Sequence, residues 1–212
     1  MNPIISRFEN IKSLISNSNV KIIAVSKTFP YDHISALVDH GHLHFGENKV
    51  QEAISKWSDL KKNKPNVKLH MIGKLQSNKA KDAVKLFDYI HSLDSQKLAN
   101  ILAKQENITN KKLKYFIQVN IGNEKQKGGI AINFLDDFYY YCLKELKINV
   151  IGLMAIPPND VRVDDYFKKL MELNKSLGLK ELSMGMSSDF KIALNYETTF
   201  VRIGSSIFGN RG

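Results

Sequence analysis

The chain has 212 residues, of which 43% are hydrophobic and 25% are charged, a composition typical of a globular protein large enough to bury a core. No apolar run approaches the ~20 residues that a membrane-spanning helix needs, and charged residues interrupt the first segment, MNPIISRFEN, so we expect neither a membrane anchor nor a signal peptide. The single cysteine, Cys142, cannot form an internal disulfide, and we therefore expect a cytoplasmic protein.

The net charge of +10 raises the question of nucleic-acid binding. Lysine supplies 27 of the 31 basic residues, whereas arginine, which makes the bidentate contacts typical of base recognition, supplies four. The densest basic runs, at 61–64 and 111–114, are short and are typical of helix ends or loops. We therefore favour a solvated lysine-rich surface and keep a nucleic-acid-binding module as an alternative that rests on charge alone.

The chain opens with a predicted helix and then alternates short apolar runs with longer amphipathic ones. The predicted strands are 21–27, 42–47, 68–73, 89–93, 115–121, 150–156, 181–185 and 200–206. The predicted helices are 3–17, 31–40, 49–61, 95–107 and 164–177. Asp94 or Ser95 is expected to cap the fourth of these helices, and Asn159 or Asp160 precedes the fifth.

Eight predicted strands, each followed by a helical stretch except the last, indicate an α/β protein with a parallel sheet. Eight repeats in about 200 residues predict a closed (β/α)₈ TIM barrel near its lower size limit, with one extra helix at the N-terminus. The alternative is an open doubly wound sheet. No low-complexity segment or linker divides the chain, so we expect one domain over residues 1–212.

The first predicted strand, KIIAVSKT at 21–28, ends in a lysine. In a barrel the carboxyl ends of the strands form the active-site mouth. Because side chains alternate along a strand, Lys27 shares a face with Ile23 and Val25 and points into the mouth if those two fill the interior. A lysine there is a solvated end residue, an anion ligand or a Schiff-base nucleophile, and the strand alone leaves all three open.

Two loops near the end of the chain are suited to binding a phosphate. Gly185 and Ser187 follow the seventh predicted strand, and Gly204, Ser205 and Ser206 follow the last apolar run. Small residues and hydroxyls there expose backbone N–H groups, and the phosphate site of a barrel is commonly built by the loops after strands seven and eight. The alternative is that these residues simply form turns.

Other polar residues fall near the predicted mouth. Arg202 lies in the otherwise apolar last strand, and if buried it needs an acceptor: a phosphate, a pyridine nitrogen or a structural carboxylate. Glu47 and Asn48 follow the second strand, where Asn48 either caps the next helix or faces a ligand. After the third strand, Gln76 offers a similar choice.

The histidines are candidate zinc ligands, because three imidazoles suit that metal. His42 and His44 are expected to share one strand face, with His70 on the next strand. His42 stands away from the mouth, and no cysteine or closely spaced carboxylate completes a set, so we expect no metal site.

Six segments, in this order, resemble one known family: AVSKT (24–28), FGENKVQE (45–52), IGKLQSNK (72–79), GLMAIPP (152–158), LSMGMSSD (182–189) and VRIGSSIFG (201–209). Together they resemble the pyridoxal phosphate homeostasis protein family, whose members look like the N-terminal barrel of alanine racemase standing alone. The resemblance extends from about residue 20 to residue 211.

The resemblance implies that pyridoxal 5′-phosphate (PLP) is held as a Schiff base on Lys27. It implies phosphate contacts from Ser187, Gly204 and Ser205, with Arg202 near the pyridine ring or phosphate and Asn48 near the ring. It also implies a role in the supply and buffering of PLP inside the cell, with effects on amino-acid and keto-acid balance and no clear catalytic turnover.

Two positions depart from the family pattern. Lys74 stands where the family commonly has histidine, and this adds a cation near the mouth, either for anions or facing solvent. Ser205 stands where the family commonly has threonine, and it keeps the hydroxyl, so phosphate binding is expected to survive.

The main alternative is a PLP-dependent amino-acid racemase or decarboxylase. Racemases of this fold pair the lysine with a tyrosine from a second domain, whereas this sequence ends at Gly212, directly after the last predicted strand. We therefore expect a non-enzymatic PLP carrier. We expect it to be monomeric, with PLP-dependent apo-enzymes as candidate recipients and with no specific nucleic-acid or membrane partner.

Overall fold

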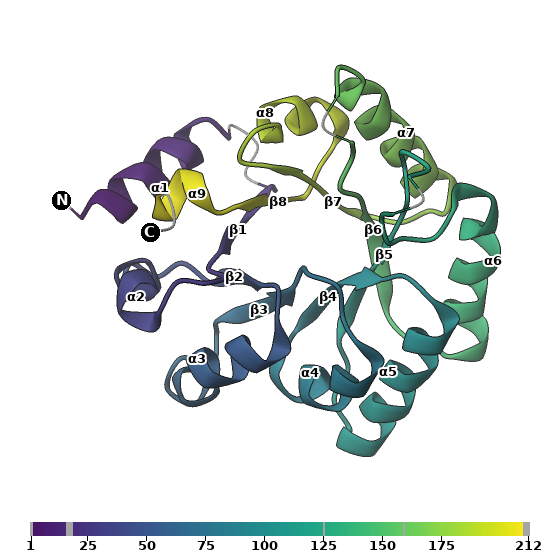
Figure 1. The fold of residues 1–212 in the computed structure, drawn as a ribbon, viewed down its shortest axis with the longest axis horizontal. Helices are drawn as coiled ribbons and strands as arrows, with labels where there is room; N and C mark the ends of the chain where they lie inside the picture. Colours follow the sequence, from purple (N-terminus) through teal and green to yellow (C-terminus); the bar gives the residue numbers. More distant parts are fainter. Residues whose placement is uncertain (1, 16–18, 125, 159, 210–212) are drawn as a thin grey trace.

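The structure is a computed structural model that describes residues 2–15, 19–124, 126–158 and 160–209. Its strands form a closed parallel barrel in which each strand pairs with the next along the chain and the last pairs with the first (Figure 1). The strands are β1 (Lys21–Val25), β2 (His44–Glu47), β3 (Lys68–Met71), β4 (Tyr89–Leu93), β5 (Lys114–Gln118), β6 (Val150–Met154), β7 (Glu181–Met186) and β8 (Phe200–Ile203). The barrel prediction is confirmed, and the open sheet is excluded.

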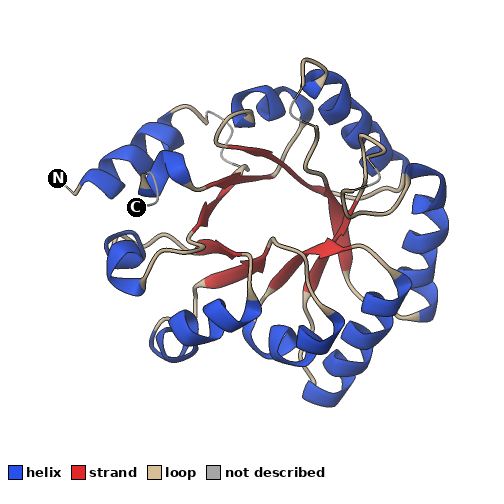
Figure 2. Cartoon of the chain, viewed as in Figure 1, coloured by secondary structure: helices blue, strands red, loops and turns tan. Residues whose placement is uncertain are grey.

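Helices surround this barrel on the outside (Figure 2). They are α1 (Pro3–Ser13), α2 (Tyr31–Asp39), α3 (Val50–Asn63), α4 (Ala80–Leu86), α5 (Gln96–Thr109), α6 (Leu135–Tyr140), α7 (Val163–Ser176), α8 (Phe190–Ala193) and α9 (Ser205–Phe208). Helix α1 is the expected extra helix, and it packs beside α9, where Arg7 Nε donates to Ile207 O over 2.7 Å. Within the described ranges, no helix is long and apolar enough to cross a membrane.

Several predicted elements extend too far. The strand expected over 200–206 ends at Ile203, and Ser205 begins α9, so the last strand is in fact followed by a helix. The backbone of Gly204 (φ −115°, ψ −83°) leaves the extended region at this point. The first helix ends at Ser13 rather than at residue 17, and residues 16 and 17 lie outside the described part of the chain.

The two capping predictions had different outcomes. Ser95 caps α5, because its Oγ accepts from Leu98 N over 3.3 Å. Helix α7 begins at Val163, one residue before the predicted start, and Asp160 Oδ1 accepts from Arg162 N (2.8 Å) in the turn that precedes it. Asn159 lies outside the described residues.

Side chains of the strands alternate between two apolar layers. Ile22 and Ala24 belong to the large cluster shared with the surrounding helices. Ile23 belongs instead to a small cluster inside the barrel, whose members are Ile23, Tyr89, Phe116, Met154 and Phe200. The strands are therefore buried on both faces, which explains their continuous apolar runs and confirms that the face of Ile23 is the inner one.

Candidate functional site

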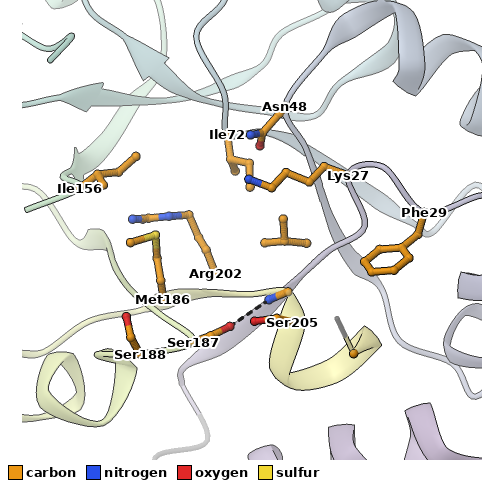
Figure 3. Close-up of a pocket in the computed structure, with 13 residues that line it drawn as sticks. Lys27, Phe29, Asn48, Ile72, Ile156, Met186, Ser187, Ser188, Arg202 and Ser205 are labelled. Carbon is orange, nitrogen blue, oxygen red and sulfur yellow. Dashed lines mark hydrogen bonds between the residues drawn. The ribbon is translucent and has the colours of Figure 1, made fainter. Parts of the chain in front are cut away.

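A cavity of about 670 Å³ lies at the carboxyl-terminal end of the barrel. We call it the mouth pocket, and its lining residues are Val25, Lys27, Phe29, Asn48, Ile72, Ile156, Met186, Ser187, Ser188, Arg202, Gly204, Ser205 and Gly209 (Figure 3). The structure brings together in this pocket all six residues that the family resemblance selects: Lys27, Asn48, Ser187, Arg202, Gly204 and Ser205. They come from the first two and last two strand–loop units of the closed barrel.

A buried carboxylate holds the turn that carries Lys27. Ser26 Oγ donates to Glu47 Oε1 over 2.7 Å, and the same oxygen accepts from Lys56 Nζ (2.8 Å) and Trp57 Nε1 (2.9 Å). These bonds tie the end of β1 to β2 and α3, so Lys27 extends from a fixed turn into the pocket (Figure 3). Glu47 ends β2 at the mouth, as predicted, but its side chain does not line the pocket, because it shares the outer strand face with Phe45 and is fully buried toward α3.

The loops after β7 and β8 meet on the other side of the pocket. Gly204 N donates to Ser187 Oγ over 3.4 Å, which is a long bond, and Ser205 follows at the start of α9. Gly185 adopts φ +91°, a conformation that favours glycine, and a Cβ there would lie 2.8 Å from the Ala193 side chain. The two loops therefore place serine hydroxyls and a backbone N–H beside one another, as the sequence predicted.

Arg202 is buried, and its guanidinium donates hydrogen bonds to neutral groups. Its Nη1 donates to Ser183 O (2.8 Å) and Ser183 Oγ (2.7 Å), and its Nη2 donates to Ala155 O (2.9 Å). Burial lowers the pKa of Arg202 to about 10, against the opposing effect of Asp189. The acceptors among the described residues are thus carbonyls and a hydroxyl rather than a structural carboxylate. A guanidinium has five N–H donors, so two have no acceptor among the described residues and are suited to a pocket ligand.

Asn48 lines the pocket and does not cap α3, whose N-cap residue is Lys49. Sequence reasoning missed the apolar part of the lining, Phe29, Ile72, Ile156 and Met186, together with Gly209 after α9. These residues lie in or beside loops, where no periodic pattern marks a side chain as pocket-facing. Their position after predicted strands was the one available signal.

Lys74 lines neighbouring cavities rather than the mouth pocket, and it is exposed. One of these cavities, of about 330 Å³, also contains Asp94, Gln118 and Asn120. Burial raises the pKa of Asp94, and the positive charge of Lys74 opposes that effect.

The described residues hold no group of three potential ligands that could bind a metal. The expectation that His42 and His44 share a strand face is wrong, because β2 begins only at His44. The ring of His42 packs on Phe8 and Phe45, outside the barrel, and its Nε2 contacts the carbonyl oxygen of His44 at 2.9 Å.

Solved structures share this fold. PipY of Synechococcus elongatus PCC7942, solved with PLP bound, matches with a TM-score of 0.89 and 34% identity over 97% of this chain and 100% of that chain. The same protein without PLP gives 0.90 and 35% identity. Alanine racemase of Clostridium difficile 630 matches with a TM-score of 0.77 at 15% identity, covering 57% of that chain, which supports a common fold alone.

Curated proteins extend the comparison to sequence. A pyridoxal phosphate homeostasis protein of Aquifex aeolicus is 39% identical over 90% of this chain and 87% of its own length. The protein of the same name from Escherichia coli K12 is 34% identical over 92% and 88%. The family model described as "Alanine racemase, N-terminal domain" matches residues 2–212. The chain therefore belongs to the alanine racemase N-terminal domain family and, within it, to the pyridoxal phosphate homeostasis proteins.

Proposed function

We propose that this protein binds PLP in the mouth pocket and acts in PLP homeostasis as a carrier or buffer, with effects on amino-acid and keto-acid balance. The observation that carries the proposal is the convergence, in one cavity, of the Lys27 amine with the hydroxyl-bearing loops at Ser187 and Ser205. The names of the curated relatives and the PLP bound in the PipY neighbour support it.

The donors of the pocket suit a phosphate. Ser187, Ser188 and Ser205 supply hydroxyls, and a phosphate oxygen can replace the long bond that Gly204 N makes to Ser187 Oγ. Arg202 adds a positive charge to the same pocket, which favours an anionic ligand. A volume of about 670 Å³ falls within the usual range for small-molecule sites.

We assign the covalent link to Lys27. When bound, PLP supplies an aldehyde that forms a Schiff base with a neutral lysine amine. Asn48 and the apolar side chains Ile72, Ile156 and Met186 line the same pocket and would border the ring.

The lining favours a carrier over an enzyme. Arg202 offers only N–H donors, so a pyridine nitrogen bound beside it would stay unprotonated, and the ring would be a weak electron sink. The relatives are named for homeostasis and not for a reaction. We extend the proposal to a monomeric, single-domain protein over residues 1–212 that works in the cytoplasm and donates PLP to apo-enzymes.

The test is the absorbance of the purified, PLP-loaded protein. We expect a band in the region of a protonated Schiff base, and we expect Lys27→Ala to abolish it. Lys74→Ala is the matched control, because Lys74 is a lysine of the same end of the barrel that does not line the mouth pocket. A band that survives Lys27→Ala would show that the link is elsewhere.

A second experiment separates carrier from enzyme. The loaded protein is given each amino acid in turn, and chirality and α-proton exchange are followed. We expect no robust turnover, while PLP passes to an apo-enzyme in a coupled assay. Sustained racemisation or decarboxylation would overturn the carrier assignment and leave the cofactor site intact.

A further inference from the structure

A continuous chain of polar groups crosses the inside of the barrel and ends at Arg202. His44 Nδ1 lies 2.9 Å from His70 Nε2, and His70 Nδ1 lies 2.9 Å from His91 Nε2. His91 Nδ1 lies 2.9 Å from Ser183 Oγ, which accepts from Arg202 Nη1 over 2.7 Å. The chain therefore links His44, the first residue of β2 at the amino-terminal end of the barrel, to an arginine of the mouth pocket at the other end.

Aromatic rings hold the members of this chain in place. The His70 ring stacks on Tyr89 with a centroid distance of 4.2 Å and an interplanar angle of 10°. The His91 ring stacks on Phe116 at 4.3 Å and 18°. Both imidazoles and Ser183 are fully buried. Polar groups in such surroundings need complementary partners, so the direction of every hydrogen bond matters.

The arginine sets that direction. Arg202 can only donate, so Ser183 Oγ must accept from it. The one remaining partner of Ser183 Oγ among the described residues is His91 Nδ1, which must therefore accept the serine proton. His91 then donates from Nε2 to His70, and His70 donates from Nε2 to His44. All N–H and O–H dipoles point away from the cation, which is also the electrostatically favourable arrangement.

We propose that His44, His70, His91 and Ser183 form a positioning network that orients Arg202 and couples the hydrogen-bonding state of residue 44, at the amino-terminal end of the barrel, to the mouth pocket. A donor at position 44 would reverse the chain, because His70 Nε2 would have to accept. His70 and His91 would then carry their protons on Nδ1, and Ser183 Oγ would receive two donors. The effect on PLP rests on the proposed cofactor site, whereas the direction of the chain does not.

The surroundings of His44 keep it neutral. Its charged neighbours are Lys21 of β1, Lys68 of β3, Lys114 of β5 and Asp88 before β4, and the rings of Tyr89 and Phe200 pack against it. Lys21 also pairs with Glu181 at 3.8 Å. Burial, followed by the charges of Lys21 and Lys68, lowers the pKa of His44 to about 4. Burial also lowers the pKa values of His70 and His91 well below the ordinary range. All three imidazoles are therefore neutral at neutral pH.

The direction of the chain is tested in the PLP-free protein. Two-bond ¹⁵N–¹H correlation spectra at neutral pH assign the proton of each imidazole to Nδ1 or Nε2. We expect the Nε2–H form for both His70 and His91. An Nδ1–H form at either residue in the wild-type protein would overturn the proposed direction. This result does not depend on whether the pocket binds PLP.

Coupling along the chain is tested by two replacements at one position. His44→Arg places a permanent donor next to His70, and we expect it to switch His91, two steps away, to the Nδ1–H form. His44→Glu places an acceptor there and should leave His91 unchanged. Unchanged His91 signals in both variants would overturn the coupling. Neither measurement requires bound PLP.

The effect on the pocket is tested with a matched pair of serines. Ser183→Ala breaks the chain without removing a residue that lines the mouth pocket, and we expect several-fold weaker PLP binding and a shifted absorbance band. Ser92→Ala is the control, because Ser92 is also buried, lies next to His91 and has a hydroxyl with no partner among the described residues. Equal PLP affinities and equal absorbance bands in the two variants would show that the network only packs the interior, and would overturn the positioning role. If neither variant nor wild-type protein bound PLP, the cofactor proposal would fail instead, and the tautomers would still decide the direction.

Discussion

Gly73 lies so close to Asn48 that a Cβ on Gly73 would stand 2.4 Å from the Asn48 carbonyl oxygen and 2.9 Å from the Asn48 side chain. Two strand ends, those of β2 and β3, therefore approach one another at the rim of the mouth pocket. Because the nearest atoms are backbone atoms, a side chain at residue 73 cannot be accommodated by a rotamer change. The position of Asn48 in the pocket depends on this glycine.

The first prediction is that Gly73→Ala displaces Asn48 and weakens PLP binding. We expect the dissociation constant to rise about tenfold, which corresponds to roughly 1.4 kcal/mol. Titration of the PLP-free protein with PLP, followed by absorbance, measures it. Gly128→Ala is the matched control, since a Cβ there would meet its nearest neighbour, Asp94 Oδ2, at an ordinary 3.4 Å. Equal affinities in the two variants would contradict the role given to Gly73.

The site residues were predictable where a charged side chain occurs in a buried strand, because few structural roles accommodate it there. A lysine at the end of a buried strand, and an arginine within one, each require a partner or a function, and Lys27 and Arg202 do line the pocket. Phe29 and Ile156 were not predictable, because an apolar side chain in a loop is as compatible with core packing as with a ligand. The orientation of the Glu47 side chain was not predictable, because its burial depends on Lys56 and Trp57 of another element.

The fold was predictable from the alternation of strands and helices, but element ends were not. The strand expected to run through residue 206 ends at Ile203, and α9 follows it. The glycine and serines after Ile203 show no apolar periodicity, so the sequence did not predict where the strand ends. The histidine chain was also missed. The chain requires His91 of β4 to contact Ser183 of β7 inside the barrel. These residues are far apart in the sequence, so no local pattern predicts that contact.

The second prediction concerns the buried carboxylate behind Lys27. Glu47→Ala removes the acceptor of Ser26, Lys56 and Trp57 and leaves the buried Lys56 ammonium without its closest carboxylate, which lies at 2.8 Å. Loss of one partner of a buried ion pair costs roughly 3–5 kcal/mol. We expect urea unfolding to show this loss, together with weaker PLP binding because the turn that carries Lys27 is released.

A surface glutamate provides the comparison. Glu197 pairs with Lys175, but its side chain is 64% exposed. Glu197→Gln is therefore expected to change the free energy of unfolding by roughly 0–1 kcal/mol and to leave PLP binding unchanged. If Glu47→Ala were as mild as this surface change, the hydrogen bonds around Glu47 would not stabilise the turn.

The third prediction is that the protein loses stability as the pH falls below about 6.5. Burial is the main cause that lowers the pKa values of His42 and His44 from 6.5 to about 4. In the unfolded chain both imidazoles take up protons near pH 6.5, while in the folded protein they stay neutral until about pH 4. The unfolded state therefore binds more protons in this window, and the stabilisation, complete above 6.5, is lost progressively down to 4.

At pH 5 the loss amounts to roughly 2 kcal/mol for each of the two histidines. His70 and His91, whose pKa values burial also lowers, act in the same direction. We expect urea unfolding at about pH 7.5 and about pH 5 to show the difference, and we expect His42→Gln to reduce it, because glutamine takes up no proton. His42 lies outside the histidine chain, so this variant separates general acid sensitivity from the coupling to Arg202. An equal free energy of unfolding at the two pH values would mean that these imidazoles are hydrated and titrate normally in the folded protein.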